Sequence, residues 1–255
     1  MTTKVTVALA AIGLMIGMSG SVHAATNFVT NGSFETITGA SGGQLGDETE
    51  ATGWTTTGYN FLFTSVAQAG TGVTGSAGNL QLWTPANTSE NPANNHLNSN
   101  NGFVASPDGG NFVADDGAYE VQPLSQTVTG LTVGRQYTVT FYWGAAQQSG
   151  YYTATTDQWI VSLGGQSFST PVDSIAAEGF SGWTQQSFTY TATAGSEVLT
   201  FLANGTPAGE PPFALLDGVT MFATPEPSSL AVMSIGALAL AGIILRRLRT
   251  KKPIV

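Results

Sequence analysis

The sequence has no cysteine among its 255 residues, so disulfides, thiolate metal sites and a cysteine nucleophile are all excluded. Histidine is almost as scarce, with only His23 and His96. His96 lies in a polar, Asn-rich stretch, where a histidine is usually solvated. A catalytic triad would therefore lack its base, and a zinc site would lack nitrogen and sulfur ligands.

Positive charge is nearly missing from the middle of the chain. Arg135 is the only Lys or Arg between Lys4 and Arg246, whereas all 16 Asp and Glu residues lie there. Nucleic-acid binding needs clustered Lys or Arg, so nucleic acid is excluded as a partner. The acidity favours solubility outside the cell, with binding of divalent cations as the alternative.

The first 24 residues predict a secretory signal peptide. Lys4 is followed by an apolar run from Val5 to Met18, and small residues lead up to Ala24. A positive start, an apolar middle and a small-x-small end are typical of such a peptide. We expect cleavage after Ala24 and export of the rest; a transmembrane anchor is the alternative.

The C-terminal segment predicts a single transmembrane helix at about residues 229–245. This uncharged run, with Ser228, just reaches the lower bound of about 17 residues for crossing a bilayer. The basic residues that begin with Arg246 and Arg247 should stay in the cytoplasm by the positive-inside rule. The helix would hold the domain on the outer side of the inner membrane.

Residues 224–252 resemble the PEP-CTERM sorting signal. Pro225, Glu226 and Pro227 precede the apolar run, and a short basic end containing Arg246 and Arg247 follows it. The resemblance implies that a membrane enzyme of the exosortase type recognises and cleaves the tail. The mature protein would then be released or attached at the cell surface or in an extracellular matrix. A plain single-pass anchor is the alternative.

Residues 25–223 predict one all-β domain, an antiparallel β-sandwich or jelly roll. Charged residues make up only 9% of the chain, against about 25% in typical proteins. The clearest alternation of apolar and polar residues lies in 137–143. Further strands are expected at 124–128, 159–163, 166–170, 183–191, 197–203 and 213–222, and more weakly at 59–65, 79–83 and 111–114.

Several short motifs resemble the galactose-binding-like jelly rolls that include many carbohydrate-binding modules. They are the run from Asn31 to Glu35 near the mature start, Trp54 after a Gly-rich stretch, and the run from Ala214 to Val219. The resemblance implies the same sandwich and a carbohydrate-binding role for residues 26–222.

In many such modules a structural Ca²⁺ joins the two chain ends, and Glu35 and Asp217 match its acidic ligands. Ca²⁺ takes six to eight oxygens from carboxylates and carbonyls. The alternative is a pair of exposed or hydrogen-bonded acids. The chain departs from the motif at Gly218, where a second acid often stands.

Asp115, Asp116 and Glu120 are the carboxylates that a glycosidase could use. Adjacent strand residues face opposite sides, so Asp115 and Asp116 would not pair in an extended segment. The segment is more typical of a turn, with an occasional calcium site as the alternative. We expect no enzyme activity.

Sugar binding would use exposed aromatic rings beside amide groups. Gln147, Gln148, Tyr151 and Tyr152 combine both in one predicted loop, and Tyr59 is a further candidate. The leading hypothesis is a non-catalytic surface or matrix protein that binds glycan or exopolysaccharide. The alternatives are a structural or adhesive matrix protein without a ligand site and a carbohydrate-active enzyme.

Overall fold

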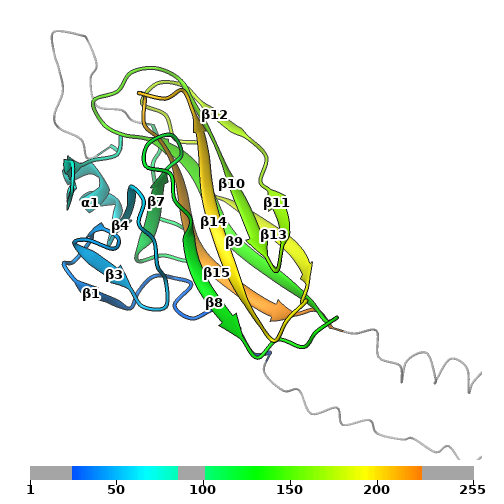
Figure 1. Cartoon of the computed structure of the whole chain (residues 1–255). Helices are drawn as coiled ribbons and strands as arrows, with labels where there is room; N and C mark the ends of the chain where they lie inside the picture. The colour runs from blue at the N-terminus through cyan, green and yellow to red at the C-terminus, as the bar shows by residue number, and fades with distance from the viewer. Residues whose placement is uncertain (1–24, 86–100, 226–255) are drawn as a thin grey trace, which may run out of the picture.

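The computed structural model describes residues 25–85 and 101–225, which fold almost entirely into antiparallel strands. Figure 1 shows the long strands β8, β9, β14 and β15 packed together, with the short elements β1, β3 and α1 gathered to one side. The all-β antiparallel fold predicted for residues 25–223 is confirmed at this level.

The larger sheet has six strands. Their order is β13 (Thr184–Thr191), β9 (Gln136–Gln147), β15 (Pro212–Ala223), β7 (Phe112–Asp116), β4 (Asn60–Phe63) and β2 (Gly43–Gln44). The other sheet has five strands. Its path is β11 (Gln166–Ser169), β10 (Thr155–Leu163), β14 (Ser196–Thr206) and β8 (Leu124–Thr129), and β12 (Asp173–Ile175) also pairs with β10.

Two small hairpins and one helical turn complete the described residues. The hairpins join β1 (Ile37–Gly39) to β3 (Thr49–Ala51) and β5 (Val73–Gly75) to β6 (Gly78–Leu80). The helix α1 (Val66–Thr71) begins at Ser65, whose side chain accepts a hydrogen bond from the backbone N–H of Gln68. That cap satisfies one of the amides that a helix start leaves unpaired.

The main core lies between the two sheets. Alternate residues of β9 and β10 are buried, because their side chains point inward at every second position. Phe201 of β14 packs against Phe141 and Trp159, with ring centroids 5.0 and 5.8 Å apart. The alternation predicted for these strands therefore forms the inner face of a sandwich.

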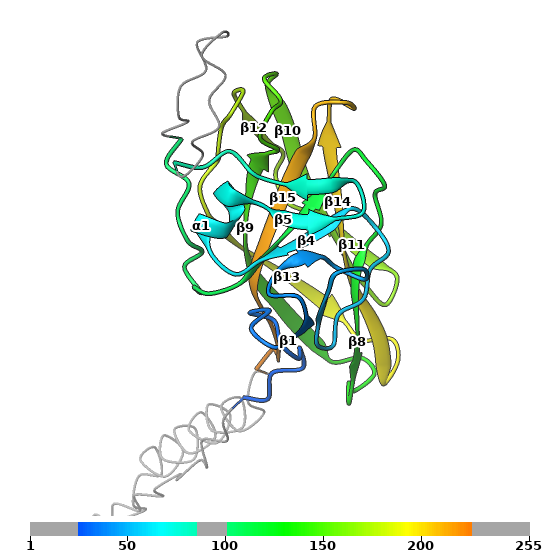
Figure 2. The ribbon, with the colours of Figure 1, turned by 90° about the vertical axis from the view of Figure 1, so that its left-hand side faces the viewer.

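A second core covers the outer face of the larger sheet at one end. Phe61 of β4, Phe112 of β7 and Phe213 of β15 are buried there with residues from α1 and the β5–β6 hairpin. Figure 2 shows α1 and β5 lying over β4 and β15. Both faces of β4 and β7 are therefore covered, and every residue of these two strands is buried.

The two ends of the described domain lie side by side. The backbone N–H of Phe28 donates to the carbonyl of Met221 over 2.9 Å. The predicted signal peptide, the predicted transmembrane helix and the sorting signal from Glu226 onward lie outside the described residues. Within residues 25–85 and 101–225, no helix is long and apolar enough to span a bilayer.

Candidate functional site

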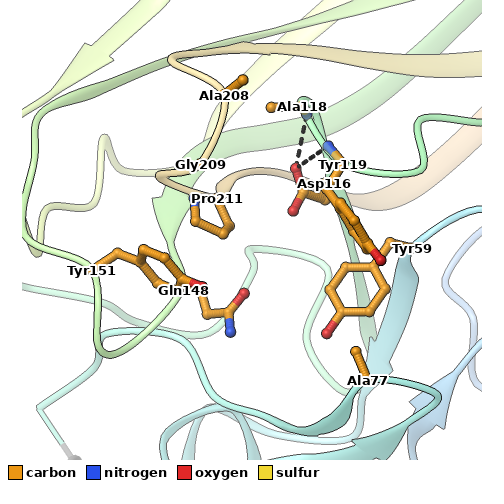
Figure 3. Close-up of a pocket in the computed structure, with 10 residues that line it drawn as sticks. All are labelled: Tyr59, Ala77, Asp116, Ala118, Tyr119, Gln148, Tyr151, Ala208, Gly209 and Pro211. Carbon is orange, nitrogen blue, oxygen red and sulfur yellow. Dashed lines mark hydrogen bonds between the residues drawn. The ribbon is translucent and has the colours of Figure 1, made fainter.

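The main candidate site is a cavity of about 390 Å³ at one end of the sandwich. It opens where β7 and β9 end and where the chain turns from β14 into β15. Figure 3 shows its lining: Tyr59, Ala77, Asp116, Ala118, Tyr119, Gln148, Tyr151, Ala208, Gly209 and Pro211. A volume of this size falls in the usual range for small-ligand pockets, about 300–1,000 Å³.

Tyrosine rings form much of the wall. Tyr59 and Tyr119 meet edge to face, with centroids 5.2 Å apart and planes at 87°. Tyr59 is buried, whereas Tyr119 leaves 51% of its surface exposed. In Figure 3 Tyr151 lies across the cavity from these two rings, beside Gln148. The pocket therefore offers aromatic surface on two opposite walls.

The segment that carries Gln148 and Tyr151 is held by hydrogen bonds to two other parts of the chain. The indole N–H of Trp83 donates to the carbonyl of Tyr151 over 3.0 Å. The backbone N–H groups of Tyr152 and Thr153 donate to Glu210 Oε2 over 3.2 and 3.3 Å. These contacts fix the backbone of the segment, so its side chains face the cavity from a defined position.

The floor of the pocket carries a carboxyl group, that of Asp116. Its Oδ1 accepts hydrogen bonds from the N–H groups of Ala118 and Tyr119 over 2.8 and 3.0 Å, whereas Oδ2 is buried without a partner. Burial raises the pKa of Asp116 to about 6, although the two N–H donors oppose the shift. The carboxyl is therefore mostly ionised at neutral pH.

Two further aspartates lie buried behind the floor. Asp115 points to the opposite face of β7, where its Oδ2 accepts a hydrogen bond from Asn60 Nδ2 over 2.8 Å. Asp157 of β10 is fully buried, and neither of its oxygens has a partner. Burial, together with the nearby Asp116, raises both pKa values well above the ordinary range. Burial thus disfavours the charged form of both Asp115 and Asp157.

The four residues predicted for a sugar site separate into two groups. Gln148 and Tyr151 line the cavity. Gln147 is fully buried, and its amide donates to the carbonyl of Thr153 and accepts from the N–H of Glu178. Gln147 thus holds the loop in place and is not part of the pocket lining, although the sequence predicts it as a ligand contact. Tyr152 packs on Trp83 outside the lining, with ring centroids 5.7 Å apart.

Sequence reasoning assigned no sugar contact to Tyr119 or Asp116. From the sequence, Asp116 is a possible glycosidase carboxylate or a turn residue with an occasional calcium site, and Tyr119 lies in the turn that follows it. The two N–H bonds that Asp116 accepts are typical of an aspartate that begins a turn. The turn brings Tyr119 beside Tyr59, which is 60 residues away in the sequence, and no local pattern predicts such a contact.

Asp217 lies within electrostatic range of both Glu35 and Asp108, on the face of β15 that carries Phe213 and Leu215 of the second core. Asp217 Oδ2 is buried without a hydrogen-bond partner. Burial raises the pKa of Asp217 to about 7; the Ser106 hydroxyl and the Gly218 N–H lower it, and Asp108 and Glu35 raise it further. An orphaned, buried carboxylate oxygen suits a cation ligand.

Glu35 reaches this region through a close backbone approach. Its Oε1 accepts a hydrogen bond from the N–H of Asn111 over 2.7 Å. The same oxygen would lie 1.8 Å from a Cβ at Gly110, where φ is +71°. Within the described ranges, however, no three acidic, histidine or cysteine side chains gather closely enough to bind a metal ion. Any ion here would need backbone carbonyls or water as additional ligands.

No protein-family model matches this chain, and no curated protein matches it. The solved structures similar to it include a CBM61 protein in complex with β-1,4-galactotriose, at 14% identity and a TM-score of 0.42, covering 78% of this chain and 100% of that one. A CBM22-1 xylan-binding domain from Paenibacillus barcinonensis shares 14% identity with a TM-score of 0.38, over 80% of this chain and 97% of that one.

A third similar structure is the CBM6cm-2 carbohydrate-binding module of Cellvibrio mixtus lichenase 5A in complex with cellotriose. It shares 21% identity with a TM-score of 0.30, over 48% of this chain and 84% of that module. Identities and TM-scores this low leave the function to be argued from the site itself.

In protein stripped of metal by a chelator, we expect the free energy of unfolding to fall as pH rises from about 4 to about 7. The folded-state pKa of Asp217, about 7, lies above its ordinary value of 3.8. The folded state therefore holds an extra proton across this window and loses that stabilisation as the proton leaves. Urea unfolding at a series of pH values measures the slope.

Asp217→Asn keeps an acceptor for the Gly218 N–H and should reduce the dependence of the free energy of unfolding on pH. Part of the dependence should remain, because the pKa values of buried Asp115, Asp116 and Asp157 are also raised. Glu50→Gln, at an exposed position, is the matched control. Equal slopes in wild type and Asp217→Asn would contradict the assignment.

Proposed function

We propose that the domain is a non-catalytic glycan-binding module, a galactose-binding-like jelly roll that holds exopolysaccharide in the pocket at the end of the sandwich. The observation that carries this proposal is the cavity of about 390 Å³ with Tyr59, Tyr119 and Tyr151 on opposite walls. Sugar rings present apolar C–H faces with hydroxyl groups around the edge. Aromatic walls bind the faces, and polar groups between them bind the hydroxyls.

The polar groups of the pocket suit hydroxyl recognition. Gln148 is only half-buried, and its side-chain amide forms no hydrogen bond with the described residues. A free amide offers both donors and acceptors. Asp116 adds an acceptor-only group at the floor. One amide, one carboxylate and the tyrosine hydroxyls would fix the orientation of a bound sugar.

The proposal is non-catalytic because the pocket lining holds only one carboxyl group, Asp116. A glycosidase of the usual kind needs two, held about 5–10 Å apart on either side of the scissile bond. Glu210, which follows Gly209 of the lining, already accepts hydrogen bonds from Tyr152 and Thr153. It is therefore engaged in holding the loop.

We further propose that Glu35 and Asp217 bind a structural Ca²⁺. The support is the orphaned Oδ2 of Asp217 and the position of Glu35 within electrostatic range of it. A divalent cation would favour the ionised form of both groups and so remove the cost of burying Asp217. The two residues come from opposite ends of the domain, so the ion would tie these ends together.

For the whole chain we propose export by the signal peptide of residues 1–24, with the tail of residues 224–252 sorted by an exosortase-type enzyme. The support is the order of Pro225-Glu226-Pro227, an uncharged run and the basic end that begins with Arg246 and Arg247. The precursor would be anchored in the inner membrane, and the mature domain would lie at the cell surface or in the matrix.

Replacing Tyr151 or Tyr119 by Ala should weaken glycan binding by about tenfold or more, since stacking on one aromatic ring contributes on the order of 1–2 kcal/mol. A glycan array identifies a ligand, and calorimetry measures the dissociation constant. Phe168→Ala removes an exposed ring far from the pocket and is the matched control. Wild-type affinity in both tyrosine variants would reject the pocket.

Calcium should raise the melting temperature of chelator-treated protein, and more so at pH well above 7 than below it, because the ion displaces the proton of Asp217. Asp217→Asn and Glu35→Gln should each abolish the rise, while Glu50→Gln should keep it. A melting temperature that calcium leaves unchanged in wild type would refute the calcium site.

Replacing Pro225, Glu226 and Pro227 by Ala in the full chain should leave an uncleaved, membrane-bound precursor in an exosortase-bearing host. Immunoblots against tags placed near either end of the chain measure processing. Replacement of the neighbouring Ser228 and Ser229 by Ala is the control and should be processed normally. Normal processing of both variants would argue against recognition of this motif.

A further inference from the structure

The pocket end of the domain has a carboxylate, and no Lys or Arg of residues 25–85 and 101–225 lies near it. Arg135, the only Lys or Arg of the described residues, directly precedes β9, whereas Gln148 of the pocket directly follows that strand. The 12 residues of β9 separate the two positions by roughly 40 Å, at about 3.3 Å per residue. That separation is several times the screening length of about 8 Å at physiological salt.

The charge that a ligand meets in the pocket is therefore that of Asp116. Asp116 is the carboxyl group of the lining, whereas burial disfavours the charged forms of Asp115 and Asp157 behind it by raising their pKa values. Asp116, with a pKa of about 6, is mostly ionised at neutral pH, and its Oδ2 is buried without a hydrogen-bond partner. A buried carboxylate oxygen without a donor is energetically unfavourable until a ligand supplies one.

The walls of the pocket, like its floor, favour a positively charged ligand. Tyr59, Tyr119 and Tyr151 surround the cavity with aromatic surface, and the faces of aromatic rings attract cations. A carboxylate beside several aromatic rings is the arrangement that favours an ammonium group. The same arrangement disfavours an anion, which would meet like charge in a partly desolvated space.

Resting on the glycan-binding function proposed above, we infer that the pocket selects sugars that carry a free amine. The preferred class is a hexosamine polymer with unacetylated amino groups. The ammonium group would approach Asp116 at the floor, while the ring lies between the tyrosines and the Gln148 amide takes a hydroxyl. Neutral sugars would bind more weakly, and uronic-acid polymers would be rejected.

The test uses oligosaccharides that differ only in charge at one position. Wild-type domain is titrated with a β-1,4-linked glucosamine tetramer, with its fully N-acetylated counterpart and with an oligogalacturonate, and an array extends the amine–acetamide pairs to other linkages. We expect the amine form to bind at least tenfold more tightly than the acetylated form, with that advantage shrinking as salt screens the charges.

Two variants locate the charge effect. Asp116→Asn keeps the Oδ1 acceptor for the Ala118 and Tyr119 amides and should weaken binding of the amine form much more than binding of the acetylated form, which removes most of the amine preference. Ala77→Lys places a cation at the exposed rim of the lining and should lower amine binding severalfold. The second variant keeps the test decisive if the first fails to fold.

The outcomes separate the two proposals. Equal affinity of wild type for the amine and acetylated partners, or an amine preference that survives both variants, overturns the selectivity and leaves the glycan pocket standing. Absence of binding to every oligosaccharide overturns the glycan-binding function, and the selectivity with it. Tight binding of the amine form that both variants reduce supports the inference.

Discussion

The fold depends on the packing of aromatic side chains between the two sheets. Phe201 contacts Trp54, Phe141 and Trp159, which belong to three separate parts of the chain. Burial of one such ring contributes a few kcal/mol, and the loss of Phe to Ala in a core costs about 3–5 kcal/mol. Because there is no cysteine to form a disulfide, this aromatic packing must hold the two sheets in position. The positions of the sheets in turn determine where the loops at their ends lie.

The register also decides where charge is buried. Inward positions of β10 run from Leu163 and Trp159 to Asp157 and Thr155, so the apolar row ends in a carboxyl group at the pocket end. Burial raises the pKa values of two of the acids there, Asp115 and Asp157, and the only Lys or Arg of the described residues, Arg135, lies at the other end of β9. Scarcity of Lys and Arg, which is a feature of composition, thus becomes a local electrostatic feature of one end of the sandwich.

The sequence predicts the strands that alternate and is weaker on those that do not. The segment 137–143 lies within β9, because one face of that part of the strand is buried and the other is partly exposed. β4 and β7 gave weak signals because the second core buries both of their faces. The sequence could not place α1 for a different reason: its six residues are too few to show a helical period.

The pocket was predictable only in part, because some of its residues come together only through the pairing of strands that are distant in the sequence. Tyr151 and Gln148 stand in a loop whose composition predicts a surface site, whereas Tyr59 and Tyr119 meet only because β4 and β7 are neighbours in the sheet. Gln147 differs from Gln148 by one position, and this single step places one amide in the core and the other in the cavity. Composition identifies the loop, and strand register decides which residue a ligand meets.

Strand β15 connects the two candidate sites, which are far enough apart to respond independently. Phe213 of β15 lies opposite Asp116 in the sheet, and Asp217 lies four residues further along the same strand. Four residues of extended chain span about 13 Å, beyond the distance of about 7–10 Å within which substitutions usually interact. In the pairing of β15 with β9, the register also shifts between Asp217 and Thr220, just beyond this point. Substitutions at Asp217 should therefore alter cation-dependent stability without changing sugar affinity, and those at Asp116 should do the reverse.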